Sequence, residues 1–149
     1  MILTDFNKID TSLYTSNNVK IDCFEHKEES ILVINITGKL EDGSAAANDC
    51  NYIREQIAIA IYKTTPIAII IDIQDMQYQY GNSIINAFAP LYEIDLFDGD
   101  GFIYAFVLSD KNKYGLSSLW VFDIDSPREG IYYNFDKAMQ YILERYEKI

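Results

Sequence analysis

A short apolar run in the middle of the chain constrains the fold more than any other feature. Residues 67–71 read Ile-Ala-Ile-Ile-Ile. This run is too short for a helix, and it lacks the alternation of a strand that has one face in water. Such runs are typical of central strands in α/β sheets, which are covered on both faces. Residues 102–108 form a second run of the same kind. We therefore predict that 67–71 and 102–108 are adjacent central strands.

A polar loop and the start of a helix follow the first run. Asp72 and Asp75 end the apolar stretch, and residues 81–83, Gly-Asn-Ser, supply a tight turn with two side chains that commonly cap helices. A helical pattern then begins at Ile84. A strand, a polar loop and a helix N-terminus in this order form the place where open α/β sheets bind ligands. The sequence therefore predicts a binding site in this loop.

The segments before this centre predict a strand pair and a long helix. Residues 19–23 and 31–36 are expected to pair as antiparallel strands, joined by a turn at 26–30. Ser44 is expected to cap the long helix, and Pro66 stops it, because a proline disfavours helix in the residue before it. The apolar face of this helix consists of Ala46, Cys50, Ile53, Ile57 and Ile61.

The segments after the centre predict three helices and a further strand. Pro90 is expected to break the helix that begins at Ile84, near Ala89. A short helix is expected at 114–119 and a strand at 120–124. The last helix is expected to be capped by Asn134.

The length and composition predict one folded domain. The chain has 149 residues, of which 49% are hydrophobic, so it can bury a substantial core. We expect residues 1–149 to form a single domain in which 1–18 are an N-terminal extension. Residues 1–8 carry charges and the apolar runs are no longer than strands, so neither a leader peptide nor a membrane helix is expected. These features predict a soluble, cytoplasmic protein.

The charge of the chain limits the partners that it can bind. With 23 acidic and 12 basic residues, the formal net charge is −11. Such a surface repels nucleic acids and anionic membranes, so neither is expected as a partner. Solubility alone would explain the charge. The alternative explanation, which we carry forward, is a basic protein partner.

Few residues are available for catalysis. His26 is the only histidine and lies in a polar segment, and Cys23 and Cys50 are expected to be buried free thiols. The chain has no glycine-rich loop of the kind that binds phosphate. We therefore predict no catalytic residue, no cofactor and no metal site.

Acidic residues gather where the predicted strands end. They are Asp72, Asp75, Asp110, Asp123 and Asp125. Carboxylate pairs can transfer protons or hold a metal ion, so a metal-dependent enzyme is a third-ranked hypothesis. Residues 95–101 superficially suggest a calcium loop but lack the spacing of an EF-hand. Solvated loop carboxylates are the more common situation, and we prefer that interpretation.

Four stretches, together with the order of the predicted elements, resemble a known family. The stretches are 31–40 (Ile-Leu-Val-Ile-Asn-Ile-Thr-Gly-Lys-Leu), 69–73 (Ile-Ile-Ile-Asp-Ile), 81–88 (Gly-Asn-Ser-Ile-Ile-Asn-Ala-Phe) and 135–139 (Phe-Asp-Lys-Ala-Met). They resemble the STAS family, the domain of anti-sigma-factor antagonists and of sulfate-transporter tails. The resemblance implies an α/β fold, a mixed β-sheet with helices packed mainly on one side. It also implies a bacterial protein that binds and regulates another protein.

The chain departs from this family at the signature of the antagonists. Their signature, Asp-Ser-Ser-Gly-Leu, contains a first serine that a partner kinase phosphorylates. Here the corresponding residues 80–84 read Tyr-Gly-Asn-Ser-Ile, so the phosphorylated position falls on Gly81. Ser83 is close by, and we interpret it as a helix cap. The resemblance therefore implies the scaffold and its exposed loop without the phosphorylation switch.

Two tyrosines in the same loop are candidates for partner binding. Tyr78 and Tyr80 alternate with glutamines just before the helix. Tyrosines in such positions are typical interface anchors, although packing over the rim of the core is equally compatible with the pattern. The predicted partner-binding residues are Asp72, Asp75, Tyr78, Tyr80, Asn82 and Ser83.

Three hypotheses about function follow from these observations. The first is a non-enzymatic STAS-like module that regulates or sequesters a basic protein partner. The alternative is a toxin-neutralising immunity protein or a similar acidic inhibitor. The third is the metal-dependent enzyme. A homodimer is left open.

Overall fold

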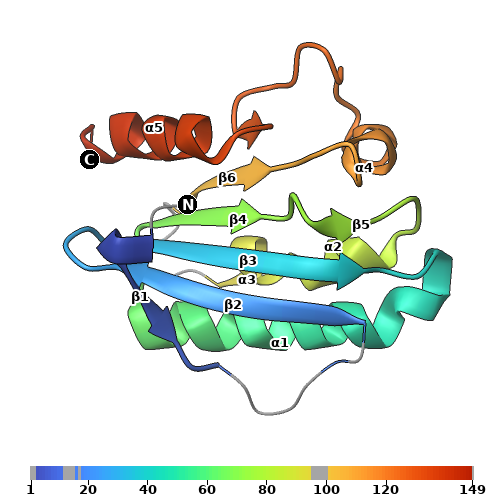
Figure 1. Ribbon diagram of the computed structural model, residues 1–149, viewed down its shortest axis with the longest axis horizontal. Helices are drawn as coiled ribbons and strands as arrows, with labels where there is room; N and C mark the ends of the chain where they lie inside the picture. Colours follow the sequence, from blue (N-terminus) through green and yellow to red (C-terminus); the bar gives the residue numbers. More distant parts are fainter. Residues whose placement is uncertain (1–2, 12–15, 17, 95–100, 149) are drawn as a thin grey trace.

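A mixed β-sheet forms the centre of the computed structural model, which describes residues 3–11, 16, 18–94 and 101–148 (Figure 1). In these ranges the sheet has seven strands in the order β1-β2-β3-β4-β6-β7, and β5 pairs with β3 beside this path. The strands are β1 (Phe6–Ile9), β2 (Val19–His26), β3 (Ile31–Lys39), β4 (Ala68–Asp72), β5 (Met76–Gln77), β6 (Ile103–Val107) and β7 (Ile131–Tyr132). Strands β1, β2 and β3 pair antiparallel, and the other pairs are parallel. The predicted antiparallel pair and the adjacent central strands are confirmed.

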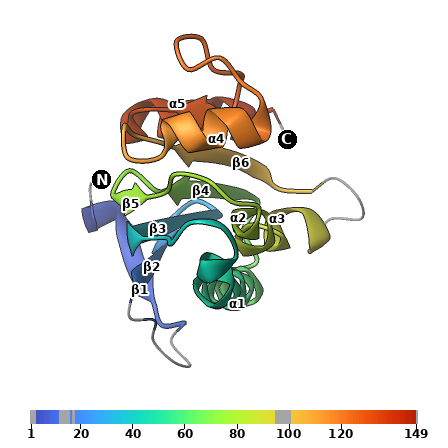
Figure 2. The ribbon, with the colours of Figure 1, turned by 90° about the vertical axis from the view of Figure 1, so that its right-hand side faces the viewer.

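The helices cover both faces of the sheet, most of them on one side. They are α1 (Ala47–Thr64), α2 (Ser83–Ala87), α3 (Pro90–Glu93), α4 (Lys113–Trp120) and α5 (Phe135–Tyr146), with 3-10 turns η1 (Leu3–Asp5) and η2 (Gly43–Ala46). In Figure 2, α1, α2 and α3 lie on one side of the sheet and α5 on the other. Leu116 of α4 belongs to the same core as α1 and α2. The expected α/β fold with helices mainly on one side is confirmed, with α5 as the exception.

Strand β4 has apolar side chains on both faces because helices cover the sheet on both sides. Ile69 and Ile71 enter the larger core under α1 and α2, whereas Ala68 and Ile70 enter the smaller core under α5. All five residues of β4 are buried. A strand between two layers needs apolar side chains at every position, because successive side chains point to opposite faces.

Several predicted details of the helices are confirmed. The predicted apolar face of α1 is buried, and the helix ends at Thr64, two residues before Pro66. Pro90 divides the next helical pattern into α2 and α3, and it occupies the first position of α3, where its missing N–H is not needed. Asn134 caps α5, its side chain accepting a hydrogen bond from the Lys137 N–H.

Three local predictions are wrong. Ser44 does not cap α1, because η2 precedes the helix and Ala46 takes the capping position. Residues 120–124 form no strand, since Trp120 ends α4 and Val121 adopts a left-handed conformation after it. Residues 6–9 of the expected N-terminal extension form the edge strand β1, paired with β2.

Two further expectations concern other parts of the chain. Cys23 and Cys50 are free and buried, as predicted. The segment 95–100, which contains most of the calcium-like sequence, lies outside the described residues. Within the described ranges, no helix is both long and apolar enough to cross a membrane.

Candidate functional site

A buried asparagine joins the turn after β4 to the turn after β6. Asn112 is 1% exposed, and its Nδ2 donates to the carbonyl oxygens of Ile73 at 2.6 Å and Met76 at 3.0 Å. Its Oδ1 accepts from the Ser109 N–H at 3.1 Å. The side chain therefore forms hydrogen bonds with backbone groups of both turns and joins the two turns to each other.

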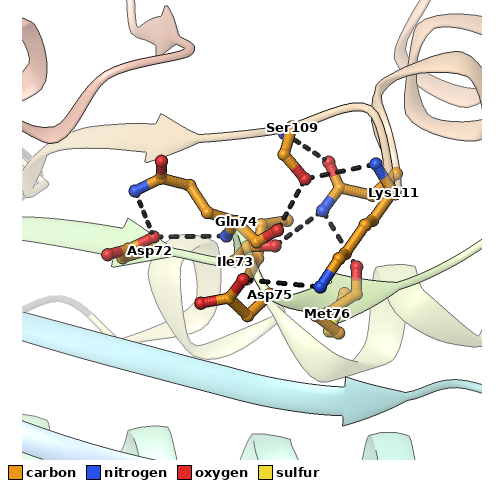
Figure 3. Close-up of polar contacts among 8 residues, drawn as sticks. Asp72, Ile73, Gln74, Asp75, Met76, Ser109 and Lys111 are labelled. Carbon is orange, nitrogen blue, oxygen red and sulfur yellow. Dashed lines mark hydrogen bonds and ion pairs between the residues drawn. The ribbon is translucent and has the colours of Figure 1, made fainter.

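Further polar contacts join the same two turns (Figure 3). We call the whole set of contacts, including those of Asn112, the clamp. The Ser109 hydroxyl donates to the Gln74 carbonyl oxygen at 2.6 Å, and Lys111 Nζ lies 3.5 Å from the Asp75 carboxylate. The backbone N–H of Tyr78 donates to the carbonyl of Lys111 at 3.1 Å. The carboxyl ends of β4 and β6 are thus tied together, and the segment that leaves β5 starts from a fixed point.

The loop at 78–82, between β5 and α2, is held against η2 by two glycines. Gly81 has φ +125°, and a Cβ there would lie 2.8 Å from the Cα and N of Gly43. The Gly43 N–H donates to the carbonyl of Tyr80 at 3.2 Å, and the Ser83 hydroxyl to the carbonyl of Gly43 at 3.4 Å. A side chain at position 81 would meet both a strained backbone conformation and a backbone clash.

The same loop is held on its other side by α4. A Cβ on Gly115 would lie 2.2 Å from the Gln79 carbonyl oxygen and 2.8 Å from the ring of Tyr78. Glycine is therefore needed for α4 to approach the loop this closely. The loop is enclosed between η2 and α4, so its backbone is rigidly placed although it lies at the surface.

The two tyrosines of this loop have opposite environments. Tyr78 is 4% exposed, and its hydroxyl donates to the Gly81 carbonyl at 2.7 Å. Burial raises the pKa of Tyr78. Tyr80 is 62% exposed. The expectation that Tyr78 contributes an accessible anchor is therefore wrong, since its ring belongs to the core, and Tyr80 is the accessible ring.

Tyr80 shares a groove with a second exposed ring. Tyr114 at the start of α4 is 61% exposed. A groove of about 410 Å³ lies between them, lined also by Gln79, Ser118 and Leu119. We call the exposed groups that line this groove, Gln79, Tyr80, Tyr114 and Ser118, together with the half-buried Leu119, the tyrosine surface.

The carboxylates predicted to form an acidic rim do not converge. Asp72 is buried and accepts hydrogen bonds from the backbone and side-chain nitrogens of Gln74, at 3.2 and 3.1 Å. Asp75 is exposed and paired with Lys111, and Asp110 lies 2.7 Å from Lys113. The charges of Asp75 and Asp110 are therefore each offset by a lysine. The expected acidic rim is therefore not formed, and Asp72 is too buried to belong to an accessible site.

The other predicted rim and capping residues also differ from expectation. Asp123 and Asp125 are exposed but follow α4 rather than a strand. Asn82 precedes α2 and is exposed, yet its side chain makes no capping hydrogen bond. Ser83 is the first residue of α2 and binds Gly43, so the interpretation of either residue as the side-chain cap is wrong.

The buried thiols have little nucleophilic character. Burial raises the pKa of Cys23 to about 12 and that of Cys50 to about 11, so both stay protonated near neutral pH. Among the described residues, no group of three or more His, Cys, Asp or Glu side chains is arranged to hold a metal ion.

Sequence reasoning missed the residues that shape the tyrosine surface. Asn112 and Ser109 lie in a short polar stretch after the second apolar run, and Gly43 and Gly115 are single glycines without a local motif. A polar residue directly after a central strand is a weak signal for a turn. Contacts between residues distant in the chain, such as that of Gly115 with Gln79, leave no signal in local patterning.

The architecture is that of the anti-sigma factor antagonist class of fold. The crystal structure of an anti-sigma factor antagonist from Mycobacterium paratuberculosis aligns with a TM-score of 0.58 over 88% of this chain and 99% of that chain. The two sequences are 18% identical over the match, so the likeness is one of fold. It confirms the fold that the resemblance to the STAS family implied. Comparison with protein-family models and with curated proteins finds no match.

Proposed function

We propose that this protein is a non-enzymatic regulatory module of the STAS type, acting as a single domain that binds a protein partner through the tyrosine surface. The carrying observation is that two exposed rings, Tyr80 and Tyr114, lie on either side of a groove, next to a loop packed closely against Gly43 and Gly115. Tyrosine is enriched among the residues that dominate binding energy at interfaces. A loop already fixed by neighbouring elements loses little conformational entropy on binding, which favours affinity.

The fold likeness supports the coarse class of this proposal. The similar solved structure is named an anti-sigma factor antagonist, a protein that acts on another protein. The proposed partner is basic, since the chain carries a net charge of −11. We propose that the protein is cytoplasmic and bacterial, in keeping with this class of regulator.

The geometry at Gly81 bears on how such a module would be regulated. A serine there would place its Cβ 2.8 Å from the backbone of Gly43. The tight packing that fixes the loop is therefore incompatible with a phosphorylatable side chain at this position. We propose that partner binding is not switched by phosphorylation at position 81.

The contacts of the carboxylates weigh against the enzyme hypothesis, which is based on an acidic rim at the strand ends. A metal-dependent enzyme that uses this rim would need two or more of the carboxylates to face one point. Asp72 is instead held by Gln74, while Asp75 and Asp110 are each paired with a lysine.

A pull-down with the full chain as bait tests the proposal. Bacterial lysate proteins retained by the wild type are identified by mass spectrometry, and binding is then quantified by surface plasmon resonance. We expect Tyr80→Ala and Tyr114→Ala each to raise the dissociation rate, by about 2 kcal/mol in binding free energy if the ring is a hot spot.

Tyr62→Ala is the matched control, because Tyr62 is 64% exposed but lies on α1, away from the groove. It should leave the rates unchanged. Equal binding by wild type, Tyr80→Ala and Tyr114→Ala would place the working surface elsewhere. A toxin as the captured protein would favour the immunity-protein alternative.

A further inference from the structure

A second hollow lies beside β6 and shares no lining residue with the groove of the tyrosine surface. Its volume is about 380 Å³, within the range of small-molecule sites. We call it the β6-edge pocket, and the lining residues used in the argument are Tyr92, Tyr104, Trp120, Arg128, Tyr141 and Arg145.

The pocket exists because β7 is shorter than β6. Strand β7 pairs only with Phe106 and Val107. The N–H of Ile103 bonds toward β4, to Ile67, and the N–H of Phe106 bonds toward β7, to Gly130. Because these directions alternate along a strand, the N–H and C=O of Tyr104 face the β7 side. Within the described part of the chain, neither group has a hydrogen-bond partner there.

Aromatic rings from several elements surround this edge. Tyr92 comes from α3, Trp120 from α4 and Tyr141 from α5, so both layers of the molecule contribute. The Tyr92 and Tyr104 rings meet edge to face with centroids 6.1 Å apart. Such walls suit a flat apolar body, which can stack on a ring or meet its edge.

The pocket also concentrates positive charge in an acidic protein. Two of the three arginines of the chain, Arg128 and Arg145, line it together with a single carboxylate, that of Glu129. Arg145 is engaged with Glu129 at 3.0 Å. Arg128 Nη1 donates to the Trp120 carbonyl at 2.8 Å, which orients the guanidinium and leaves its other donors for a further acceptor.

We propose that the β6-edge pocket binds a small aromatic carboxylate. The guanidinium of Arg128 and the backbone N–H of Tyr104 are the donors for the carboxylate, and the rings of Tyr92 and Trp120 contact the aromatic body. Arginine suits this role because its fork of donors matches the two oxygens of a carboxylate. This ligand site is separate from the proposed partner surface, and neither proposal depends on the other.

Trp120 supplies a direct readout, because it is the only tryptophan of the chain and lines the pocket. The full chain is titrated with phenylacetate, and with phenylacetamide as its neutral analogue, while tryptophan fluorescence is recorded. We expect a saturable change with phenylacetate, with a dissociation constant on the order of a millimolar for a ligand of this size. Phenylacetamide should bind about tenfold more weakly, since it lacks the charge.

Substitutions distinguish this pocket from general attraction of an anion. Arg128→Gln should weaken phenylacetate binding about tenfold, whereas Lys20→Gln, which removes the same charge from β2, away from the pocket, should not. The amide resonance of Tyr104 in a 15N-labelled wild-type sample should shift on titration, a readout that needs no variant. The proposal would be overturned by the absence of a saturable change, by equal binding of acid and amide, by an unmoved Tyr104 amide, or by equal effects of the Arg128→Gln and Lys20→Gln variants.

Discussion

The side chain of Asn112 makes three hydrogen bonds to the backbone of two turns from a position that is 1% exposed. Two of these groups are carbonyls of the turn after β4, and the third is the N–H of Ser109 in the turn after β6. One residue therefore positions the segment from which Tyr78 and Tyr80 depart.

We expect Asn112→Ala to lower the free energy of unfolding by roughly 3 kcal/mol, because it removes three hydrogen bonds made by a buried side chain to the backbone of two turns. Urea denaturation followed by circular dichroism measures the change. Asn82→Ala is the control, since Asn82 is exposed and its side chain makes no capping bond. That variant should stay within about 0.5 kcal/mol of the wild type. Equal stability of the two variants would contradict the importance of the clamp.

The buried thiols make stability depend on alkaline pH. Cys23 and Cys50 have an ordinary pKa of 9.0, raised to about 12 and about 11 by burial. In the unfolded chain they ionise first, so above pH 9 the native state binds more protons than the unfolded state. The free energy of unfolding therefore falls as pH rises, and the full contribution is present only below pH 9.

Between pH 8 and pH 10 this loss should be about 1.4 kcal/mol for each thiol. Urea midpoints at the two pH values measure it. Cys23→Ala is less stable at both values because it leaves a cavity, but the difference between its two midpoints should be smaller than in the wild type. An unchanged difference would show that Cys23 does not titrate as its burial implies.

At the scale of elements, β4 has a central place in the architecture. It pairs with β3 on one side and β6 on the other, and its alternate side chains enter both cores. The same strand ends at Asp72, beside the clamp that fixes the tyrosine surface. Disruption of β4 should therefore affect the whole molecule rather than one layer.

Ile70→Asp tests this placement. Ile70 is fully buried, and an unpaired carboxylate there costs several kcal/mol, about the whole stability of a small domain. The variant should be unfolded by circular dichroism and show no cooperative melting. Ile85→Asp is the matched control, because Ile85 is 50% exposed on α2, and this variant should fold. Cooperative melting of the Ile70→Asp variant would contradict the assignment of β4 as a central strand.

At the scale of the whole molecule, the net charge of −11 acts over longer distances than any single ion pair. The lysines near Asp75 and Asp110 balance the charge locally, so steering of a basic partner would come from more distant carboxylates. Asp123 and Asp125 are the candidates, because they are exposed in the segment that follows α4, the helix that carries Tyr114.

Once a partner has been captured, its association rate should fall as salt rises, while its dissociation rate should change little. Asp123→Asn combined with Asp125→Asn should slow association at low salt. Glu28→Asn combined with Glu29→Asn removes the same charge at the turn between β2 and β3, at the opposite end of the sheet, and should have a smaller effect (Figure 1). Rates that do not depend on salt would exclude electrostatic steering.

The sequence by itself determined the central strands, the antiparallel pair, the apolar face of α1, the break at Pro90 and the cap of α5. Each of these depends on local chemistry: side-chain periodicity, the missing N–H of proline, or a capping side chain within one turn. The resemblance to the STAS family added the fold class, which the structure confirms.

Only the tertiary structure decided which residues of the predicted site are accessible. Tyr78 and Tyr80 are equivalent in the sequence pattern, yet one ring is buried under α4 and the other is exposed. Asp72 and Asp75 differ in the same way, since one accepts bonds from Gln74 and the other pairs with Lys111. The bonds of Asp72 to Gln74 are local, but the contacts of Tyr78 with Gly115 and of Asp75 with Lys111 join residues more than thirty positions apart in the chain. Periodicity shows which face of its own helix or strand a residue occupies. It carries no information about which other element packs against that face.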